Sequence, residues 1–356
     1  MIHLEIGEPD FDTPANVVQA GVEALTGGQT HYTPSAGTGE IRGTIADYIS
    51  ETRRIDVSPE MVVVVPGGKP TIFYTIMALL EEGDEAIYPN PGYPIYESMI
   101  DFSGAKAVPS HIRMENGFRF DVDELRDLVT PKTRMIVINS PANPTGGVLT
   151  MSDMEAIAKI AIENDIMVLA DEIYSRIIYE GEHVSISTVP GMLERTILLD
   201  GYSKTYAMTG WRLGYGIMPV ELAQEVTRLQ TNAVSCNAAF TMVAGIEALV
   251  GPQEDVDKMV EAFRQRRNVI VDGLNDIPGF RCLKPSGAFY AFPNIEGTGK
   301  SSTEMADYLL NEAGVAVLSG SSFGEFGEGF LRLSYANSIE NLEKALANIR
   351  AAVERL

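Results

Sequence analysis

The sequence predicts an α/β protein built on a mainly parallel sheet with helices on both faces. Between about residues 61 and 204, short continuous apolar segments alternate with amphipathic ones. This alternation is typical of parallel strands that are buried on both sides and joined by helices. After about residue 220 the alternation stops, and the remaining segments predict a second, smaller α+β unit.

The segments can be assigned in chain order. Predicted strands occupy parts of 61–68, 85–90, 105–110, 134–147, 166–174 and 196–204. Predicted helices occupy 70–84, 93–104 and 152–165. The last of these opens with Ser152 and Glu155 in capping-box spacing. Further on, a helical region spans about 221–275, short strands are predicted within 279–295, 314–320 and 329–336, and a final helix within 338–356.

Length and charge limit the classes of function. At roughly 150 residues per domain, 356 residues favour two domains. The chain has 49 acidic and 27 basic residues, a net charge of −22, and no basic run. Nucleic acid and anionic membrane surfaces both attract a positive footprint, so neither is expected as a partner. An acidic surface favours solubility, and it is also typical of proteins from a salt-rich cytoplasm.

The remaining composition predicts a cytoplasmic protein without a structural metal. Cys236 and Cys282 are too few for a disulfide framework and too far apart for a metal knuckle. Four scattered histidines offer no zinc pattern. No signal peptide is expected from "MIHLEIGEPDF", and no segment approaches the ~18 apolar residues of a membrane span.

Polar residues follow several of the predicted strands. They are Gly67-Gly68-Lys69, Asn143, Asp171 and Lys204. Because ligands of open α/β sheets bind beyond the carboxyl ends of the strands, these residues predict one shared site. A glycine turn that precedes a helix can also bind phosphate through backbone N–H groups.

Each of these residues has a structural as well as a functional interpretation. Lys204 is either a Schiff-base nucleophile with Arg212 as an anion clamp, or a salt-bridge partner in a surface loop. Asp171 either pairs with a cation, such as a protonated pyridine, or caps a helix; Tyr174 adds a phenol nearby. Asn143 stands in a Pro/Gly turn, where asparagine is common for backbone reasons alone.

The motifs taken together resemble a known family. "NPTGG", "DEIY", "SKTYAMTGWRLGY", "SGAFY" and "RLSYA" occur in this order, within a region running from "GEPDFDTP" (7–14) to "LRLSYANS" (331–338). The chain resembles class I/II aminotransferases of pyridoxal phosphate (PLP) fold type I, in their aspartate-aminotransferase-like branch. This resemblance implies a large domain with a seven-stranded, mainly parallel sheet (16–265) and a smaller α+β domain (1–15 and 266–356).

The resemblance also implies roles for individual residues around PLP. Lys204 matches the lysine that binds the cofactor as a Schiff base, and Asp171 matches the carboxylate on the pyridine nitrogen. Asn143 and Tyr174 match the pair that hydrogen-bonds the phenolic oxygen of the ring. Tyr93 matches the aromatic residue stacked on the ring. The phosphate cradle is implied to comprise Gly68, Lys69, Ser203 and Arg212.

Substrate and subunit contacts follow from the same resemblance. Arg332 matches the arginine that binds the substrate α-carboxylate as a bidentate pair, with Gly7 above it and Asn143 beside it. Tyr32 matches a tyrosine that reaches the phosphate of the other subunit, so a homodimer is implied. Lys69 is the one residue that points to dicarboxylic donors; otherwise it supports the phosphate or faces solvent.

Two departures from the family pattern stand out. Many relatives carry a hydroxyl residue where this chain has Gly201, and Ser203 is expected to replace that phosphate contact. Relatives also usually carry an N-terminal arm before the segment that begins here, so we expect that the arm is either truncated or naturally absent.

The sequence therefore predicts an aminotransferase that moves an amino group between an amino acid and a 2-oxo acid. The alternatives are another fold-type-I enzyme, such as a C–S β-lyase or a cyclopropane-forming synthase, and a PLP-sensing regulatory domain. The regulatory domain is disfavoured because no basic segment could form a DNA-binding helix-turn-helix.

Overall fold

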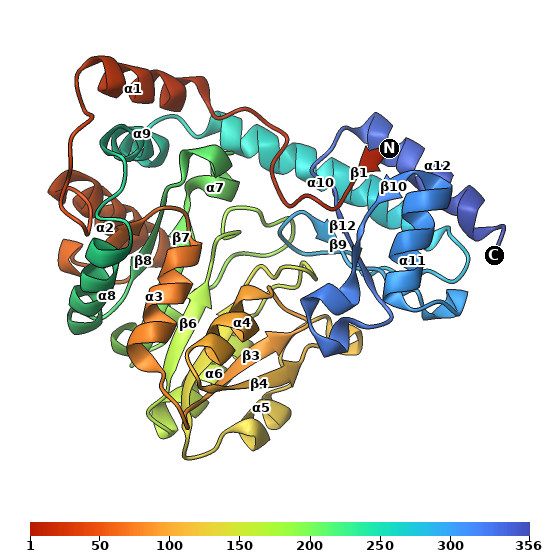
Figure 1. The fold of residues 1–356 in the computed structure, drawn as a ribbon, viewed down its shortest axis with the longest axis horizontal. Coiled ribbons are helices and arrows are strands. Elements are labelled where there is room, and N and C mark those ends of the chain that lie inside the picture. Colours follow the sequence, from red (N-terminus) through yellow and green to blue (C-terminus); the bar gives the residue numbers. More distant parts are fainter.

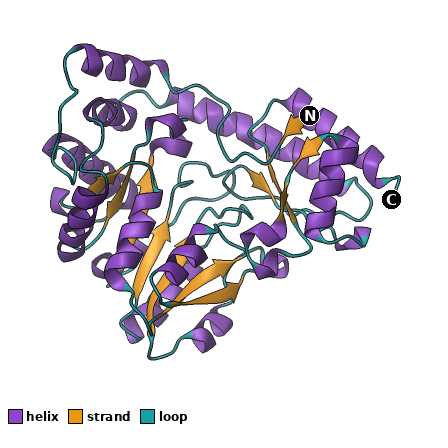
Figure 2. Ribbon diagram, viewed as in Figure 1, coloured by secondary structure: helices purple, strands orange, loops and turns teal.

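A seven-stranded sheet forms the centre of the protein (Figure 1 and Figure 2). The structure is a computed structural model that describes all residues, 1–356. The strand order is β2-β8-β7-β6-β5-β3-β4, and every neighbouring pair is parallel except the two pairs made by β8. The predicted fold class is thereby confirmed. The sheet strands are β2 Val62–Val65, β3 Glu85–Asn90, β4 Lys106–His111, β5 Thr133–Asn139, β6 Met167–Asp171, β7 Thr196–Gly201 and β8 Gly214–Ile217.

Strand β8 was not predicted, because its glycines hide the apolar pattern. A Cβ on Gly214 would lie only 2.7 Å from the carbonyl carbon of Gly67, so the close approach of β8 to the end of β2 requires glycine. Since β8 runs against both of its neighbours, β2 and β7 run in the same direction. The carboxyl end of β2 therefore lies at the same edge as the carboxyl ends of the parallel strands.

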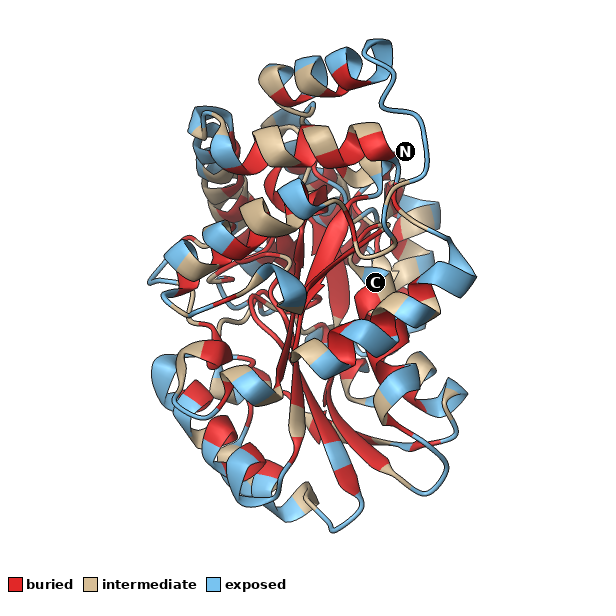
Figure 3. Cartoon of the chain, turned by 90° about the vertical axis from the view of Figure 1, so that its left-hand side faces the viewer, coloured by how far each residue is buried: buried red, intermediate tan, exposed pale blue.

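Two layers of helices cover the sheet, which explains why its strands are apolar on both sides. Along β2, Val62 and Val64 pack in one apolar cluster, and Val63 and Val65 pack in another. Helices α3, α4 and α8 cover one face; α2, α5, α6 and α9 cover the other, and α1 packs against α9. Figure 3 shows the buried strands between half-exposed helices. The helices named so far are α1 Ala15–Thr26, α2 Gly39–Arg53, α3 Lys69–Leu79, α4 Ile95–Phe102, α5 Val122–Leu128, α6 Met151–Glu163, α8 Val220–Ala233 and α9 Ala239–Val250.

Two details of the predicted helices were wrong. Helix α3 ends at Leu79 rather than 84, because Leu80 is extended and Gly83 has a φ of +98°. The capping box of α6 is formed by Thr150 and Asp153, not by Ser152 and Glu155. The predicted helical region 221–275 is confirmed, and it consists of three helices, α8, α9 and α10 Glu254–Asn275.

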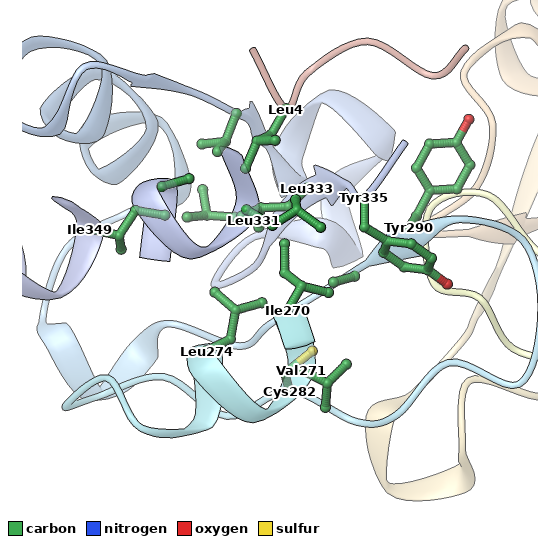
Figure 4. Close-up of a cluster of buried hydrophobic side chains, with 14 of the residues drawn as sticks. Leu4, Ile270, Val271, Leu274, Cys282, Tyr290, Leu331, Leu333, Tyr335 and Ile349 are labelled. Carbon is green, nitrogen blue, oxygen red and sulfur yellow. The ribbon is translucent and has the colours of Figure 1, made fainter. Parts of the chain in front are cut away.

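The C-terminal part forms an α+β region around its own apolar cluster (Figure 4). Its sheets are small: β1 pairs with β10 in parallel, and β11, β12 and β9 pair antiparallel. Helix α10 runs from the sheet region to this part in Figure 1. The predicted boundary at 265 falls within α10, and the domain limits stay a prediction. The remaining elements are β1 Ile2–His3, β9 Tyr290–Ala291, β10 Val315–Ala316, β11 Leu318–Ser319, β12 Leu331–Ser334, α7 Tyr202–Thr205, α11 Ser302–Tyr308 and α12 Ile339–Val353.

None of the helices combines the length and the apolar character needed to span a bilayer.

Candidate active site

A cavity of about 420 Å³ lies at the carboxyl edge of the sheet. It brings together all the predicted site residues except Tyr32. Its further lining residues include Ile6 and Glu8 of the N-terminal segment and Tyr290 of the C-terminal region, so the cavity lies between the sheet and the α+β part. The predicted residues that line it are Gly7, Gly68, Lys69, Tyr93, Asn143, Asp171, Tyr174, Ser203, Lys204, Arg212 and Arg332.

Lys204 lies in the short helix α7 that follows β7. Its ammonium donates a hydrogen bond of 2.5 Å to the carbonyl oxygen of Gly7. Burial lowers the pKa of Lys204 to about 8; the carboxylate of Glu8 opposes this shift, and the cations of Arg332 and Arg212 reinforce it. An amine with this pKa is partly neutral near pH 7–8, as a nucleophile or a proton acceptor requires.

Asp171 is the last residue of β6 and is buried. One carboxylate oxygen accepts a hydrogen bond of 2.7 Å from the hydroxyl of Tyr96, and the other accepts from the backbone N–H of Ile173. Burial raises the pKa of Asp171 to about 6, and the hydrogen bond from Tyr96 opposes this shift. A bound cation would stabilise the ionised carboxylate further. Tyr96 was not predicted.

Tyr174 pairs with a residue that sequence reasoning did not single out. Its hydroxyl lies 2.8 Å from the hydroxyl of Tyr290, whose only sequence signal was its place at the end of "SGAFY". A Cβ on Gly7 would lie 2.3 Å from the Tyr290 hydroxyl, so only glycine fits beside it. The N-terminal segment is thereby held close to the phenols.

Arg332 is buried on β12 and retains an unused donor. Its Nη1 donates to Asn143 Oδ1 at 3.2 Å, and its Nη2 donates to the carbonyl oxygen of Glu5. Its guanidinium lies between two aromatic rings, with centroid distances of 4.5 Å to Tyr290 and 4.9 Å to Phe323. The Nε of Arg332 is buried without a hydrogen-bond partner. A bound carboxylate would supply the missing acceptor.

The opposite end of the cavity is suited to an anion. Helix α3 begins at Lys69 and has no side-chain N-cap. Pro70 has no N–H and the N–H of Thr71 donates to the carbonyl oxygen of Gly68, so the N–H groups of Gly68 and Lys69 are the ones that remain for an anion. Gly67 has a φ of +81°, and a Cβ there would lie 2.2 Å from Arg212 Nη2. Arg212 itself is held by a hydrogen bond of 2.7 Å from its Nη1 to the carbonyl oxygen of Thr209.

Gly201 is explained by packing. A Cβ there would lie 3.0 Å from the Cα of Gly214 and 3.4 Å from the carbonyl oxygen of Leu213. The tight contact between β7 and β8 therefore favours glycine at this position. Ser203, which was expected to replace the missing hydroxyl, lines the cavity.

Two predicted residues lie at or beyond the rim. Lys69 is exposed, and its ammonium lies 5.5 Å from the ring centroid of Tyr93. Tyr32 is 90% exposed and lines a separate hollow with Cys236 and Asn237. Within one chain, Tyr32 does not reach the candidate site.

The residues present fit PLP. A partly buried amine of lowered pKa faces the cavity together with a buried carboxylate of raised pKa, and these suit the aldehyde and the ring nitrogen respectively. The uncapped start of α3 and the guanidinium of Arg212 suit the phosphate. The unpaired Nε of Arg332 remains for a substrate carboxylate.

Comparisons with known proteins agree with this geometry. The family model for aminotransferase class I and II matches residues 1–349. The chain is 42% identical to aspartate aminotransferase of Pyrococcus horikoshii, over 99% of this chain and 91% of that protein. It is 41% identical to aromatic-amino-acid aminotransferase 2 of Thermococcus litoralis, over 97% and 90% of the two chains.

The fold is also that of a solved relative. The crystal structure of the aromatic aminotransferase from Pyrococcus horikoshii superposes with a TM-score of 0.98 at 39% identity, covering 99% of this chain and 95% of that one. The chain therefore belongs to the aminotransferase class I and II family and is a PLP-dependent enzyme that transfers amino groups between amino acids and 2-oxo acids.

Proposed function

We propose that this aminotransferase uses the dicarboxylic amino acids aspartate and glutamate as donors and works as a homodimer. The proposal of dicarboxylic donors rests on the position of Lys69. Lys69 lines the cavity and forms no salt bridge; its ammonium lies near the ring of Tyr93. Arg332, with its unpaired Nε, suits the α-carboxylate, and a second cation at the rim suits a second carboxylate.

The side chains at the sheet edge would hold the cofactor. Lys204 would bind it covalently, Asp171 would keep its ring nitrogen protonated, and Tyr174 and Asn143 would hydrogen-bond its phenolic oxygen. Tyr93 would stack on the ring. Gly68, Ser203 and Arg212 would surround the phosphate.

When bound, PLP supplies the electron sink for cleavage at the substrate α-carbon. The protein supplies the proton transfer. With a pKa of about 8, Lys204 Nζ can accept the proton from the substrate α-carbon and then donate it to the cofactor carbon that carries the aldehyde in free PLP. Arg332 and Asn143 orient the substrate while this occurs, and the buried setting of Lys204 limits competing protonation by water.

A donor panel tests the substrate proposal. With 2-oxoglutarate or pyruvate as acceptor, aspartate and glutamate should be better donors than alanine. Lys69→Met should lower kcat/KM for dicarboxylic donors by about 1.5–3 kcal/mol, the scale of a hydrogen bond to a charged group, and leave alanine nearly unchanged. Lys159→Met, at an exposed lysine on α6, is the matched control. An equal loss for alanine and aspartate would assign Lys69 to the cofactor instead.

The dimer proposal is supported by surface features around Tyr32. Asn237 is only 4% exposed, yet both polar atoms of its side chain are unpartnered. It lines the hollow next to Tyr32 and also a second one shared with Arg212, at the proposed phosphate end. A second subunit seated over these two hollows would cover the exposed Tyr32, and its own Tyr32 would reach the phosphate.

Tyr32→Phe should then weaken PLP binding and leave the melting temperature of the apoprotein unchanged. Light scattering at assay concentration gives the oligomeric state, and an active monomer would contradict the proposal. We also infer a cytoplasmic location, because both cysteines are free.

A further inference from the structure

A cluster of buried charges lies directly behind the candidate site, on the other face of the sheet edge. Side chains alternate along a strand, so Asp171 and Leu199 face the cavity, whereas the next residues, Glu172 and Asp200, face away from it. The backbone pairing of β6 and β7 continues to this point, because the N–H of Glu172 donates to the carbonyl oxygen of Leu199 at 2.8 Å.

Arg53, the last residue of α2, bridges the two carboxylates. Its Nε donates to Glu172 Oε2 and its Nη2 donates to Asp200 Oδ2, both at 3.0 Å. The side chains are buried: that of Arg53 is 6% exposed, and those of Glu172 and Asp200 are 4% exposed. The planar guanidinium can span both acceptors at once, which an ammonium on a flexible stem cannot do equally well.

The cluster also forms hydrogen bonds with residues that are adjacent in sequence to the site residues. Glu172 follows Asp171, and its carboxylate also accepts from His183 Nε2 at 2.7 Å. Ser175 follows Tyr174 and donates to Asp200 Oδ2 at 3.1 Å. The other oxygen of Asp200 accepts from the backbone N–H of Gly201, at the start of the turn that leads to Lys204.

We propose that Arg53 is a positioning residue for the reaction: through Glu172 and Asp200 it fixes two backbone segments, one that carries Asp171 and Tyr174 and one that carries Lys204. Arg53 does not line the cavity and acts only through these segments. The inference rests on the proposed function, which gives those three residues their roles toward the cofactor.

A purely stabilising role is the alternative explanation. Buried ion pairs contribute uncertain amounts to stability, because the desolvation of the charges offsets their attraction. The geometry favours positioning, because two separate segments converge on one guanidinium: Glu172 has Asp171 and Tyr174 within two residues, and Asp200 precedes Lys204 by four. The carboxylates also affect the site electrostatically, since Asp200 and Glu172 both raise the pKa of Asp171.

The test compares Arg53→Met with Arg267→Met in the full-length apoprotein. Arg267 is a matched control: its guanidinium is also buried, and it donates to Glu180 Oε1 at 3.1 Å and to the carbonyl oxygen of Pro285 at 2.9 Å, away from the cavity. Both variants should lower the melting temperature. The affinity for pyridoxamine 5′-phosphate, measured by calorimetric titration, should fall only in Arg53→Met.

The expected loss of affinity in Arg53→Met is about tenfold or more, by analogy with the loss seen when residues that orient metal ligands are removed. In the holoenzyme, kcat should fall with little change in KM, because the Arg332 side of the site is intact. Arg53→Lys, which retains the charge but not the planar fork, should fall between wild type and Arg53→Met.

The proposal is overturned if Arg53→Met lowers stability as Arg267→Met does but binds pyridoxamine 5′-phosphate within twofold of wild type. If Arg53→Met does not fold, the affinity of Arg53→Lys decides in the same way. Asp171→Asn is the reference variant. If Asp171→Asn also binds normally, the role proposed for Asp171 fails; if only Asp171→Asn loses affinity, the role of Asp171 stands and the role of Arg53 fails.

Discussion

The two sides of the cavity are built on different principles. On the sheet side, Asp171 ends β6, Tyr174 lies three residues after it and Lys204 lies three residues after β7, so the pairing of two adjacent strands brings all three to one edge. On the C-terminal side, Arg332 is held by contacts between distant parts of the chain, since its Nη2 bonds the carbonyl of Glu5, 327 residues away.

The difference extends to how the polar groups are satisfied. Both oxygens of Asp171 have hydrogen-bond donors, whereas the Nε of Arg332 has no acceptor. A carboxylate whose hydrogen-bond donors are already in place suits a cofactor that stays bound through the catalytic cycle. A donor without an acceptor suits a substrate that binds and dissociates in each cycle. The comparison therefore predicts that changes on the sheet side act on the chemistry and on cofactor binding, and that changes on the C-terminal side act on substrate binding.

The largest effect is expected for Lys204→Ala. Loss of the amine removes the group that transfers the proton, so turnover of aspartate with 2-oxoglutarate should fall by about 10⁴-fold or more. The pH-dependent visible absorption of the bound cofactor should be lost as well. Substantial turnover without an added amine would show that another group transfers the proton.

The second-largest effect on activity is expected for Asp171→Asn. The amide keeps the shape but loses the charge that would stabilise a protonated ring nitrogen. We expect a loss of about 3 kcal/mol in kcat, the scale of removing one preorganised electrostatic group. Steady-state kinetics with saturating donor measures this loss. A near-normal kcat would show that the charge of Asp171 does not contribute to catalysis.

The buried amine should also reduce the stability of the apoprotein. The pKa of Lys204 in the folded state is about 8, below its ordinary value of 10.5, so the unfolded chain binds more protons between these pH values and stability rises with pH there. Below pH 8, Lys204→Met should therefore be more stable than wild type by roughly 3 kcal/mol, and the difference should close as the pH rises from 8 to about 10.5. Urea unfolding of the apoproteins checks this, and a constant difference would mean that the pKa is not lowered.

The smallest effect is expected on the C-terminal side. Arg332→Lys retains the charge but loses bidentate binding of the α-carboxylate. We expect a loss of about 2 kcal/mol in kcat/KM, carried mainly by KM, and an unchanged affinity for PLP. If kcat fell instead, with KM unchanged, the contrast between the two sides of the cavity would be wrong.

The sequence by itself determined the sheet and most of the cavity wall. Asp171 ends an apolar strand and Lys204 lies three residues after the next one, and parallel strands bring their carboxyl ends to one edge, so local pattern was enough to group them. The resemblance added Arg332 and Gly7, which no local pattern connects. The place of Tyr32 in a dimer stays a prediction.

Only the tertiary structure decided which residues support that wall. In the sequence Arg53 is one of two adjacent arginines near the end of a helix, and Tyr96 and Tyr290 are two of 14 tyrosines. Arg53 reaches Glu172 across 119 positions, and Tyr96 reaches Asp171 across 75. Strand β8, with its two glycines, had no apolar run to reveal it. Such contacts depend on where whole elements pack. The hydrophobic periodicity of a segment shows which of its faces is buried, but not which side chain of another segment contacts that face.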